Sequence, residues 1–397
     1  MQKLIVGIVI GAVVGILFGA SVVAPRLIPN ELEAGPQRTL DSETVDDTVI
    51  PPEGNIVETV PVTELSNTAA PSGDDGGGLN WELASAFPSD MPLFGDLPRR
   101  LEKQIETLSG GASTVRFHEP DTLAPASELM EAVRSGAVDV AYTAPVLSVD
   151  QIPALGLFGG APFGPTPTEL LAWLYAGGGM EELNSIYHNR DLHALPCGLL
   201  GAASAGWSNK KITSPEDFAG LRMRIDGPGA AIVSKLGAEP VTMLPGRVAQ
   251  ALKDGEIDAA ELSLPSVDLG FELHRVADYY YFPGWHHRST LLVLMMRLET
   301  WQSLTANHQG YLEIACGDNT RQGLADGEAT QLDALKRITS AGVDVLRLPD
   351  NVLKSLAHAW RVTAQEYSRE DEEFAQTWRS LYTFQRDFGI WYDLNQL

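Results

Sequence analysis

The stretch from Gly220 to Leu264 constrains the fold more than any other part of this 397-residue chain. Short apolar segments with strand-like alternation are separated there by glycine turns and by segments with helical spacing. The expected elements are strand 221–225, helix 230–236, strand 240–244, helix 247–253 and strand 257–262. Such a series builds an α/β sheet, in which ligand groups gather at the carboxyl ends of strands. Arg224 and Glu261 stand near two such ends, so we expect them to face one cleft.

A similar unit occurs earlier in the chain. Residues 128–145 and 247–265 both contain a helix, a glycine, two further residues, an aspartate and an apolar strand that ends at proline. Alignment of Asp139 with Asp258 places Tyr142 at the position of the glutamate in the second unit. Two such units far apart predict two similar lobes with a ligand site between them. In the simpler interpretation, each aspartate only caps its helix and starts its strand.

An uncharged apolar run covers residues 4–24. This length suffices for a helix to span a bilayer, whereas the apolar core of a secretory signal peptide is usually shorter. No convincing cleavage site follows; the best candidate is Gly19-Ala20-Ser21. The sequence therefore predicts that residues 1–24 stay on the protein as a membrane anchor or uncleaved signal. The alternative is a cleaved signal and a soluble exported protein.

Composition divides the rest of the chain into a linker and a domain. Residues 25–78 lack aromatic side chains and contain 11 acidic but only 2 basic residues. Such a segment buries too little apolar surface to fold, so we expect an acidic disordered linker. Residues 79–397 can form a two-lobed domain. We place lobe 1 at about 79–195 and 286–345 and lobe 2 at about 196–285, with the C-terminal helices packed across both.

The composition also narrows the function classes. A formal net charge of −24 would repel nucleic acids and anionic lipid surfaces. Nucleophile-elbow, zinc-protease, CxxC and P-loop motifs are absent from the sequence, and the turn Gly227-Pro-Gly229 lacks the other features of a dinucleotide loop. We therefore expect no enzymatic activity. Cys197 lies in an apolar run and Cys316 in a predicted helix, so we expect two buried free thiols.

Several motifs between Trp81 and Leu394 follow one another in a familiar order. They are GPTPTELLAWLYAGGG from Gly164, LHALPCG, GLRMRI, LGAEPV, ALKDGEIDAAE, YYYFPGWH and LRLPDNVLKSLAHAW. Together they resemble the substrate-binding proteins of TRAP (tripartite ATP-independent periplasmic) transporters. The pattern is most similar to the branch that binds 2-oxo acids or lactate. The resemblance implies an α/β, two-lobed fold of the type II periplasmic-binding-protein kind, with an interlobe cleft.

The same resemblance implies a function and one ligand-binding residue. Family members are periplasmic receptors that pass a small organic acid to TRAP membrane permease subunits. Their ligand carboxylate is held by the second arginine of a GL-x-x-R strand, which matches Arg224. This agrees with the chemistry, because the guanidinium fork fits a carboxylate through two hydrogen bonds. Arg222 shares that face of the strand, so alternation alone does not decide which arginine reaches the cleft.

Residues that hold a metal ion in the related branch are mostly replaced in this chain. The resemblance implies ligation by a glutamine, a Glu-Trp pair and a further glutamate. The corresponding residues here are Ala203, Glu261 with Leu262, and His287. Hard cations such as sodium and calcium need several oxygen ligands. We therefore expect no cofactor, with the metal ion either lost or held by a rebuilt site.

Without a cation, the carboxylate of Glu261 needs another partner. Three hypotheses remain open: pairing with His287 or Arg288, contact with a positive group on a zwitterionic ligand, or a structural salt bridge between lobes. Four aromatic residues are candidate walls of the cleft, namely Tyr142, Phe163, Trp207 and Trp285. The alternative to a transport receptor is a tethered sensor or structural ectodomain with a degenerate cleft.

Overall fold

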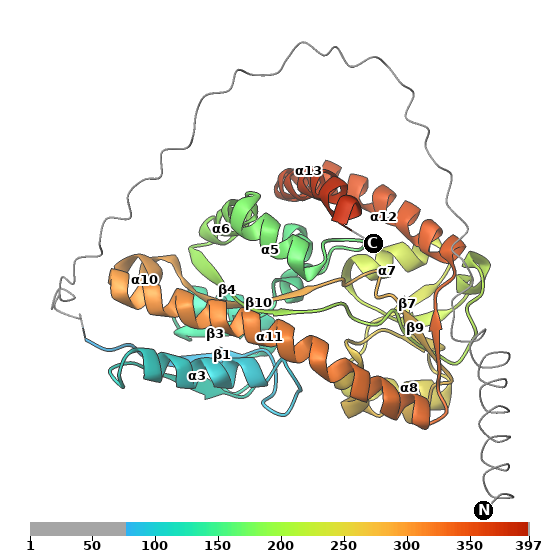
Figure 1. The fold of residues 1–397 in the computed structure, drawn as a ribbon, viewed down its shortest axis with the longest axis horizontal. Helices are drawn as coiled ribbons and strands as arrows, with labels where there is room; N and C mark the ends of the chain where they lie inside the picture. Colours follow the sequence, from blue (N-terminus) through green and yellow to red (C-terminus); the bar gives the residue numbers. More distant parts are fainter. Residues whose placement is uncertain (1–76, 396–397) are drawn as a thin grey trace, which may run out of the picture. The chain divides into compact units, whose positions relative to one another are not determined.

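The computed structural model describes residues 77–395 of the chain. The predicted anchor, residues 1–24, and nearly all of the predicted linker, residues 25–78, lie outside the described residues. Within residues 77–395, no helix is long and apolar enough to cross a membrane. This part of the chain builds two mixed β-sheets with helices packed around them (Figure 1). The predicted α/β fold with two lobes is thereby confirmed.

The sheet of the first lobe has the strand order β2-β1-β3-β10-β4. β1 (Asn80–Ser85) pairs in parallel with β2 (Thr114–His118) and with β3 (Val140–Thr143). β10 (Thr290–Arg297) runs antiparallel between β3 and β4 (Leu192–Leu200). Every residue of β3 and β4 is buried. Both strands are therefore covered on both faces, although β4 is the edge strand of this sheet.

The sheet of the second lobe has the order β11-β9-β5-β8-β6-β7. Its strands are β5 (Gly206–Ser208), β6 (Arg222–Arg224), β7 (Glu239–Val241), β8 (Ala259–Ala260), β9 (Tyr279–Phe282) and β11 (Asp344–Arg347). The sequence-based boundary, which left residues up to 345 in the first lobe, is wrong at this point. β11 pairs in parallel with β9 and so completes the second sheet.

Helices cover both sheets. In the first lobe they are α3 (Asp96–Leu108), α4 (Leu129–Arg134), α5 (Pro167–Ala176), α6 (Gly179–His188) and α10 (Leu298–Ser303). In the second lobe they are α7 (Gly227–Lys235), α8 (Pro245–Asp254) and α9 (Pro265–Asp268). The long C-terminal helices are α11 (Ala306–Ser340), α12 (Asp350–Glu370) and α13 (Glu372–Asn395). Short 3-10 turns are η2 (Ala126–Glu128), η3 (Pro145–Ser148), η4 (Pro153–Leu157), η5 (Pro215–Phe218), η6 (Leu269–Phe271) and η7 (Leu273–Arg275).

Local signals explain where these helices lie. On α3, Leu97, Leu101 and Ile105 recur at helical spacing and are buried against the first sheet. At the start of α5, the Glu169 N–H donates to the Thr166 side chain, and the Glu169 carboxylate accepts from the Thr166 N–H. This capping box satisfies two backbone donors and fixes the first turn.

The two sequence units adopt matching structures in the two lobes. α4 leads into β3, which lies parallel to β1, and α8 leads into β8, which lies parallel to β6. Oδ2 of Asp139 accepts from the backbone N–H of Glu82 at 2.9 Å, and Oδ2 of Asp258 accepts from that of Arg222 at 3.0 Å. Each aspartate therefore fastens its strand to the neighbouring parallel strand.

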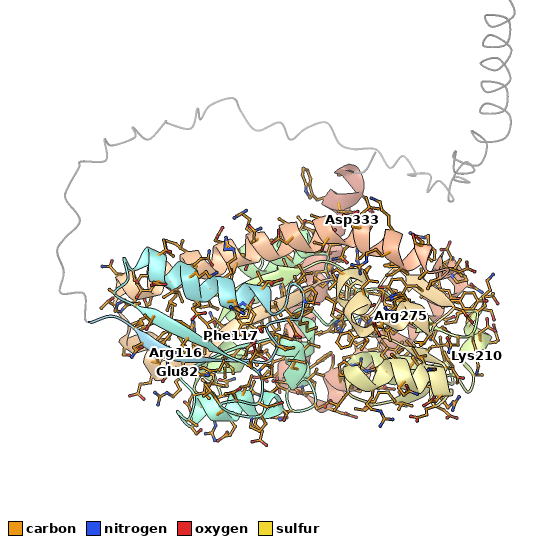
Figure 2. All side chains as sticks on the ribbon, turned by 90° about the horizontal axis from the view of Figure 1, so that it is seen from below. Glu82, Arg116, Phe117, Lys210, Arg275 and Asp333 are labelled. Carbon is orange, nitrogen blue, oxygen red and sulfur yellow. A yellow bond between two sulfur atoms is a disulfide. The ribbon has the colours of Figure 1, made fainter. Side chains whose placement is uncertain are left out.

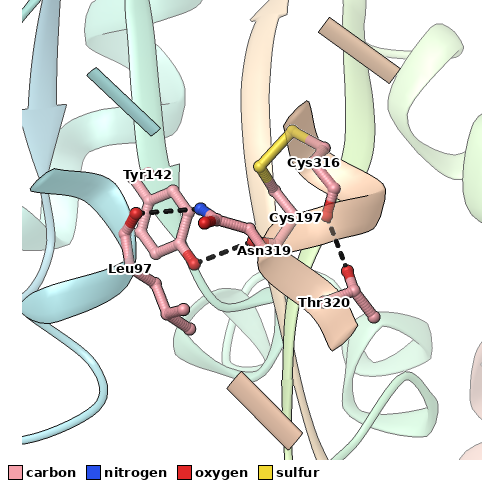
Figure 3. The surroundings of a disulfide bond; sticks show 6 residues. All are labelled: Leu97, Tyr142, Cys197, Cys316, Asn319 and Thr320. Atoms are coloured by element: carbon pink, nitrogen blue, oxygen red, sulfur yellow. Dashed lines mark hydrogen bonds between the residues drawn. A yellow bond between two sulfur atoms is a disulfide. The ribbon is translucent and has the colours of Figure 1, made fainter. Parts of the chain in front are cut away.

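Cys197 and Cys316 form a disulfide bond, so the prediction of two free thiols is wrong (Figure 3). Both residues are buried, as predicted. Cys197 belongs to β4 and Cys316 to α11, which packs along that strand. The two residues are separated by 119 positions in the sequence, so they meet only through tertiary packing. The bond fastens the long helix to the first sheet.

Hydrogen bonds around the disulfide join four elements of the first lobe in two pairs, β3 with β4 and α11 with α3 (Figure 3). The Tyr142 hydroxyl donates to the Cys197 carbonyl at 3.0 Å, and Nδ2 of Asn319 donates to the Leu97 carbonyl at 2.8 Å. Both side chains are fully buried. Strand β3, helix α3 and helix α11 are thus fixed around β4, and Tyr142 is part of this core.

The described chain passes between the lobes at four places. These are the segment from β4 to β5, the segment from β9 to β10, the length of α11, and the turn from α12 to α13. α12 packs on α7 of the second lobe, and α13 packs on α5, α6 and η4 of the first. Figure 1 shows α11 on one side of the sheets and α12 with α13 on the other. The C-terminal helices therefore pack on both lobes.

Charged side chains lie mainly on the outside of both lobes. Figure 2 shows Glu82 and Arg116 close together toward the left of the view, with Lys210 and Arg275 toward the right. Oε1 of Glu82 lies 3.4 Å from Nη1 of Arg116, and both side chains are exposed. Exposed pairs of this kind contribute about 0–1 kcal/mol. The free energy of folding therefore comes chiefly from the buried apolar clusters of the two lobes.

Candidate functional site

A cavity of about 270 Å³ lies between elements of the two lobes. The first lobe contributes η3 and the residues that follow it, and the second lobe contributes the ends of β6 and β8 with the start of α7. The lining residues are Val146, Leu147, Val149, Asp150, Arg224, Asp226, Gly227, Pro228, Glu261, Leu262 and His287. Apolar side chains thus come mainly from one lobe and charged side chains mainly from the other.

Strand ends bring Arg224 and Glu261 together, as the alternating pattern predicts. Arg224 is the last residue of β6, and Glu261 follows directly after β8. The two strands are parallel neighbours, with Arg224 paired to Ala260, and the Glu261 N–H donates to the Arg224 carbonyl at 2.8 Å. Both side chains line the cavity.

Each nitrogen of the Arg224 guanidinium has an acceptor. Nε donates to the Met243 carbonyl at 3.3 Å. Nη1 donates to the Glu261 carbonyl at 2.8 Å and lies 3.4 Å from Oε2 of the same residue. Nη2 lies 2.5 Å from Oδ2 of Asp226. The side chain is only 11% exposed, so these contacts fix the orientation of the fork.

Arg222 is directed elsewhere, which resolves the ambiguity left by strand alternation. Its Nε and Nη2 donate to the two carboxylate oxygens of Asp258, each at 3.1 Å, and Lys210 pairs with the same carboxylate. Burial raises the pKa of Asp258, but hydrogen bonds from Arg222 and Lys210 outweigh it and bring that pKa to about 2. Arg222 is therefore absent from the cavity lining and belongs to a structural ion cluster.

Glu261 pairs with a histidine, although not with the predicted one. Its Oε1 lies 3.1 Å from Nε2 of His286, and its Oε2 faces Arg224. Arg288 instead donates to the Gly164 carbonyl at 3.1 Å. Burial raises the pKa of Glu261, but His286, His287 and Arg224 lower it more, so the net shift is downward. Glu261 is thus an ionised carboxylate that braces Arg224.

His287 lines the cavity as a neutral imidazole. Burial, reinforced by the charges of His286 and Arg224, lowers its pKa to about 4 despite the opposing effect of Glu261. At neutral pH, one ring nitrogen therefore donates a hydrogen bond and the other accepts one. This suits a ligand that carries a carbonyl or hydroxyl group beside its carboxylate.

The four aromatic residues predicted as cleft walls are all absent from the cavity lining. Tyr142 lies in the core of the first lobe. Nε1 of Trp207 donates to Oδ2 of Asp268 at 2.9 Å, and its ring stacks on Tyr280 inside the second lobe. Burial raises the pKa of Asp268 to about 7, against the effect of these hydrogen bonds. Phe163 and Trp285 stack on each other, with ring centroids 6.0 Å apart.

Several residues of the cavity lining were not predicted from the sequence. Asp226 stands two residues beyond Arg224, so strand alternation places both on one side, and this signal was available. Val146, Val149 and Asp150 directly follow the strand of the first sequence unit, where the same strand-end rule applies. His286 adjoins the predicted His287, but its burial against Glu261 depends on how the turn packs.

Comparison with known proteins identifies the family. Residues 83–371 match the family model of bacterial extracellular solute-binding proteins, family 7. The chain belongs to this family. It is accordingly a solute-binding protein rather than an enzyme.

Three similar proteins are named for, or were solved with, small organic acids. A monocarboxylate 2-oxoacid-binding periplasmic protein of Nostoc sp. is 27% identical over 80% of this chain and 87% of its own length. A TRAP periplasmic solute-binding protein of Colwellia psychrerythraea, solved with calcium and pyruvate, is 28% identical with a TM-score of 0.76, covering 80% of this chain and 97% of that one. One from Pseudoalteromonas atlantica, solved with sodium and pyruvate, is 29% identical with a TM-score of 0.74 at the same coverage.

The donor set at this cavity does not fit the metal ion of those two family members. Both carboxylate oxygens of Glu261 face cationic or imidazole nitrogens, and the neighbouring lining residues are Leu262 and His287. Among the described residues, no group of three or more histidine, cysteine, aspartate or glutamate side chains could hold a metal ion. Of Ala203, Glu261, Leu262 and His287, which stand at the positions of the family's metal ligands, Glu261 alone offers a side-chain oxygen, whereas a hard cation needs several oxygen ligands.

Proposed function

We propose that this protein is the periplasmic substrate-binding component of a TRAP transporter and that it captures a small monocarboxylate of the 2-oxo-acid class. The observation that carries the proposal is the position of Arg224. Its guanidinium lies in a small cavity between two lobes, where a carboxylate could be enclosed. The ligands of the Nostoc, Colwellia and Pseudoalteromonas relatives support the ligand class.

In this proposal, three kinds of contact recognise different parts of the ligand. Arg224 holds the carboxylate through a charge-assisted hydrogen bond. Neutral His287 pairs with the 2-oxo group, and the apolar side chains of Val146, Val149 and Leu262 enclose the carbon chain. The cavity volume of about 270 Å³ favours short acids over larger ones.

In this proposal the ligand binds without a bridging cation. Glu261 then acts as the brace for Arg224. A second ligand class has one observation in its favour, since Asp150, Asp226 and Glu261 all line the cavity beside a single arginine. An excess of carboxylates attracts a ligand that carries a positive group with its carboxylate, such as a small amino acid.

Titration calorimetry on the full-length protein tests the proposal. Pyruvate, lactate and alanine are compared with and without EDTA. Arg224→Lys should weaken pyruvate binding about 10- to 100-fold, since a hydrogen bond to a charged group contributes about 1.5–3 kcal/mol. Arg222→Lys is the matched control and should leave the affinity within twofold. Equal losses in the two variants would contradict the role of Arg224, and loss of binding in EDTA would contradict cation-free recognition.

We also propose that residues 1–24 anchor the protein to the inner membrane beside TRAP permease subunits. The basis is the apolar run at residues 4–24. The Cys197–Cys316 disulfide supports an oxidising compartment such as the periplasm. Fractionation of cells should recover the full-length protein with membranes. A shortened soluble periplasmic form would show that the segment is a cleaved signal. A neighbouring signalling gene, with no permease gene nearby, would favour the alternative of a tethered sensor.

A further inference from the structure

The guanidinium that should receive the ligand carboxylate already holds two carboxylates. Oε2 of Glu261 lies 3.4 Å from Nη1 of Arg224, and Oδ2 of Asp226 lies 2.5 Å from Nη2. Backbone carbonyls occupy Nε and the remaining side of Nη1. These contacts engage four of the five N–H donors of the guanidinium, so a ligand carboxylate that takes two hydrogen bonds from the fork must displace one of these acceptors.

The two acidic partners differ in how easily they can be displaced. The Glu261 side chain is 8% exposed, whereas the Asp226 side chain is 43% exposed. Removal of Arg224 from Glu261 would leave a buried carboxylate with one cationic partner fewer, which is costly. The Asp226 carboxylate can return to water, so the loss of its pair costs far less.

The backbone at Asp226 allows this exchange. Asp226 is the residue directly before α7, with an extended backbone, and its side chain makes no capping hydrogen bond to that helix. Its carboxylate can therefore leave Arg224 without the loss of a helix-capping hydrogen bond. Within the described residues, Arg224 is the ion-pair partner of this side chain, and Asp226 also lines the cavity.

We propose that Asp226 is an internal competitor for the ligand carboxylate. In the unliganded protein its carboxylate occupies the position on Nη2 of Arg224 that the ligand takes. This inference rests on the proposed function, because it names the residue that sets affinity at the same site. The competitor lowers the apparent affinity by the fraction of molecules in which Arg224 is covered.

Asp226→Asn should therefore bind pyruvate about 3- to 10-fold more tightly than the wild-type protein, measured by calorimetry on the full-length chain. Asp150→Asn removes a carboxylate that lines the same cavity but leaves the contact between Asp226 and Arg224 in place. This variant measures how much of the change in pyruvate affinity comes from long-range electrostatics, and its gain in affinity should be smaller. Unchanged or weaker pyruvate binding in Asp226→Asn, or equal gains in the two variants, would overturn the proposal. So would a selective loss of alanine binding in Asp226→Asn, because Asp226 would then receive a positive group of the ligand.

A second measurement needs no ligand and so separates this inference from the proposed function. Phenylglyoxal modifies arginine, and mass spectrometry of the peptide that contains Arg224 reports its rate. Asp226→Asn should speed modification of Arg224 several-fold relative to Asp150→Asn, while circular dichroism checks that both variants are folded. Equal rates would overturn the inference. If wild-type protein binds none of the tested acids but the rates differ, the proposed function fails and the covering role of Asp226 stands.

Discussion

The two helix–strand units, α4–β3 and α8–β8, share a scaffold but end in different chemistry. Asp139 and Asp258 fasten equivalent strands to their parallel neighbours. Beyond the first, Tyr142 lies in the core and bonds to the Cys197 carbonyl, while beyond the second, Glu261 lies in the cavity. Both strands have a neighbour on each side, but β3 continues through Tyr142 to Thr143, whereas β8 is two residues long and the chain leaves the sheet at Glu261. The packing beyond a strand therefore decides whether its end is structural or functional.

The largest expected change in the free energy of unfolding comes from removal of the disulfide that attaches α11 to the first lobe. A disulfide joins the helix to the first lobe, and apolar contacts from residues such as Ile338 join it to the second. Replacement of Cys197 and Cys316 by alanine should lower the free energy of unfolding by about 4 kcal/mol, because the bond closes a long loop in the unfolded chain. Urea denaturation measures this value.

Hydrogen exchange sharpens the same test. Protection should fall first in β4 and in the half of α11 near Cys316, while the half near Ile338 stays protected. Dithiothreitol should destabilise the wild-type protein but not the double variant. A uniform loss of protection along α11 would mean that the helix is attached equally to both lobes.

A second prediction compares the two aspartates directly. Replacement of either by asparagine keeps an acceptor for the strand N–H, but Asp258→Asn also loses the ion pairs with Arg222 and Lys210. We expect Asp258→Asn to cost about 1–2 kcal/mol at pH 7, and Asp139→Asn clearly less. Urea denaturation of both variants at pH 7, pH 3 and pH 2 measures the costs.

The pH dependence of that difference follows from the pKa of Asp258. The folded-state pKa of about 2 lies below the ordinary value of 3.8. The stabilisation is therefore present above pH 3.8 and is lost as the pH falls toward 2. The gap between the two variants should shrink at pH 3. A gap that persists at pH 2 would show that its origin is not the ion cluster.

The smallest expected change in stability concerns Tyr142, near the end of strand β3 in the first lobe. Tyr142→Phe removes the hydrogen bond to the Cys197 carbonyl and should cost about 1 kcal/mol of stability. Since Tyr142 lies outside the cavity, the affinity for pyruvate should stay within twofold. A tenfold loss of affinity at unchanged stability would place this strand end in the binding site, against the contrast between the lobes.

Local pattern was enough to predict most of the fold. Strand alternation and helical spacing gave the elements around Arg224, and the strand-end rule brought that arginine together with Glu261. The disulfide, the membership of β11 in the second sheet and the burial of Trp207 depend on contacts between segments far apart in the chain. No spacing in the sequence reports such contacts, because they follow from how whole elements pack.

The four chain passages between the lobes also limit the mechanics of the molecule. With a single connection, the two lobes could rotate and slide relative to each other. Each further covalent connection restricts these relative motions. Ties on both sides of the sheets, through α11 and through the α12–α13 turn, leave a bend as the easy motion. In such a bend, Val146 and Val149 would approach Arg224 along a single path, because the connections oppose sliding. The geometry of capture is thereby set by the path of the chain as much as by the residues in the cavity.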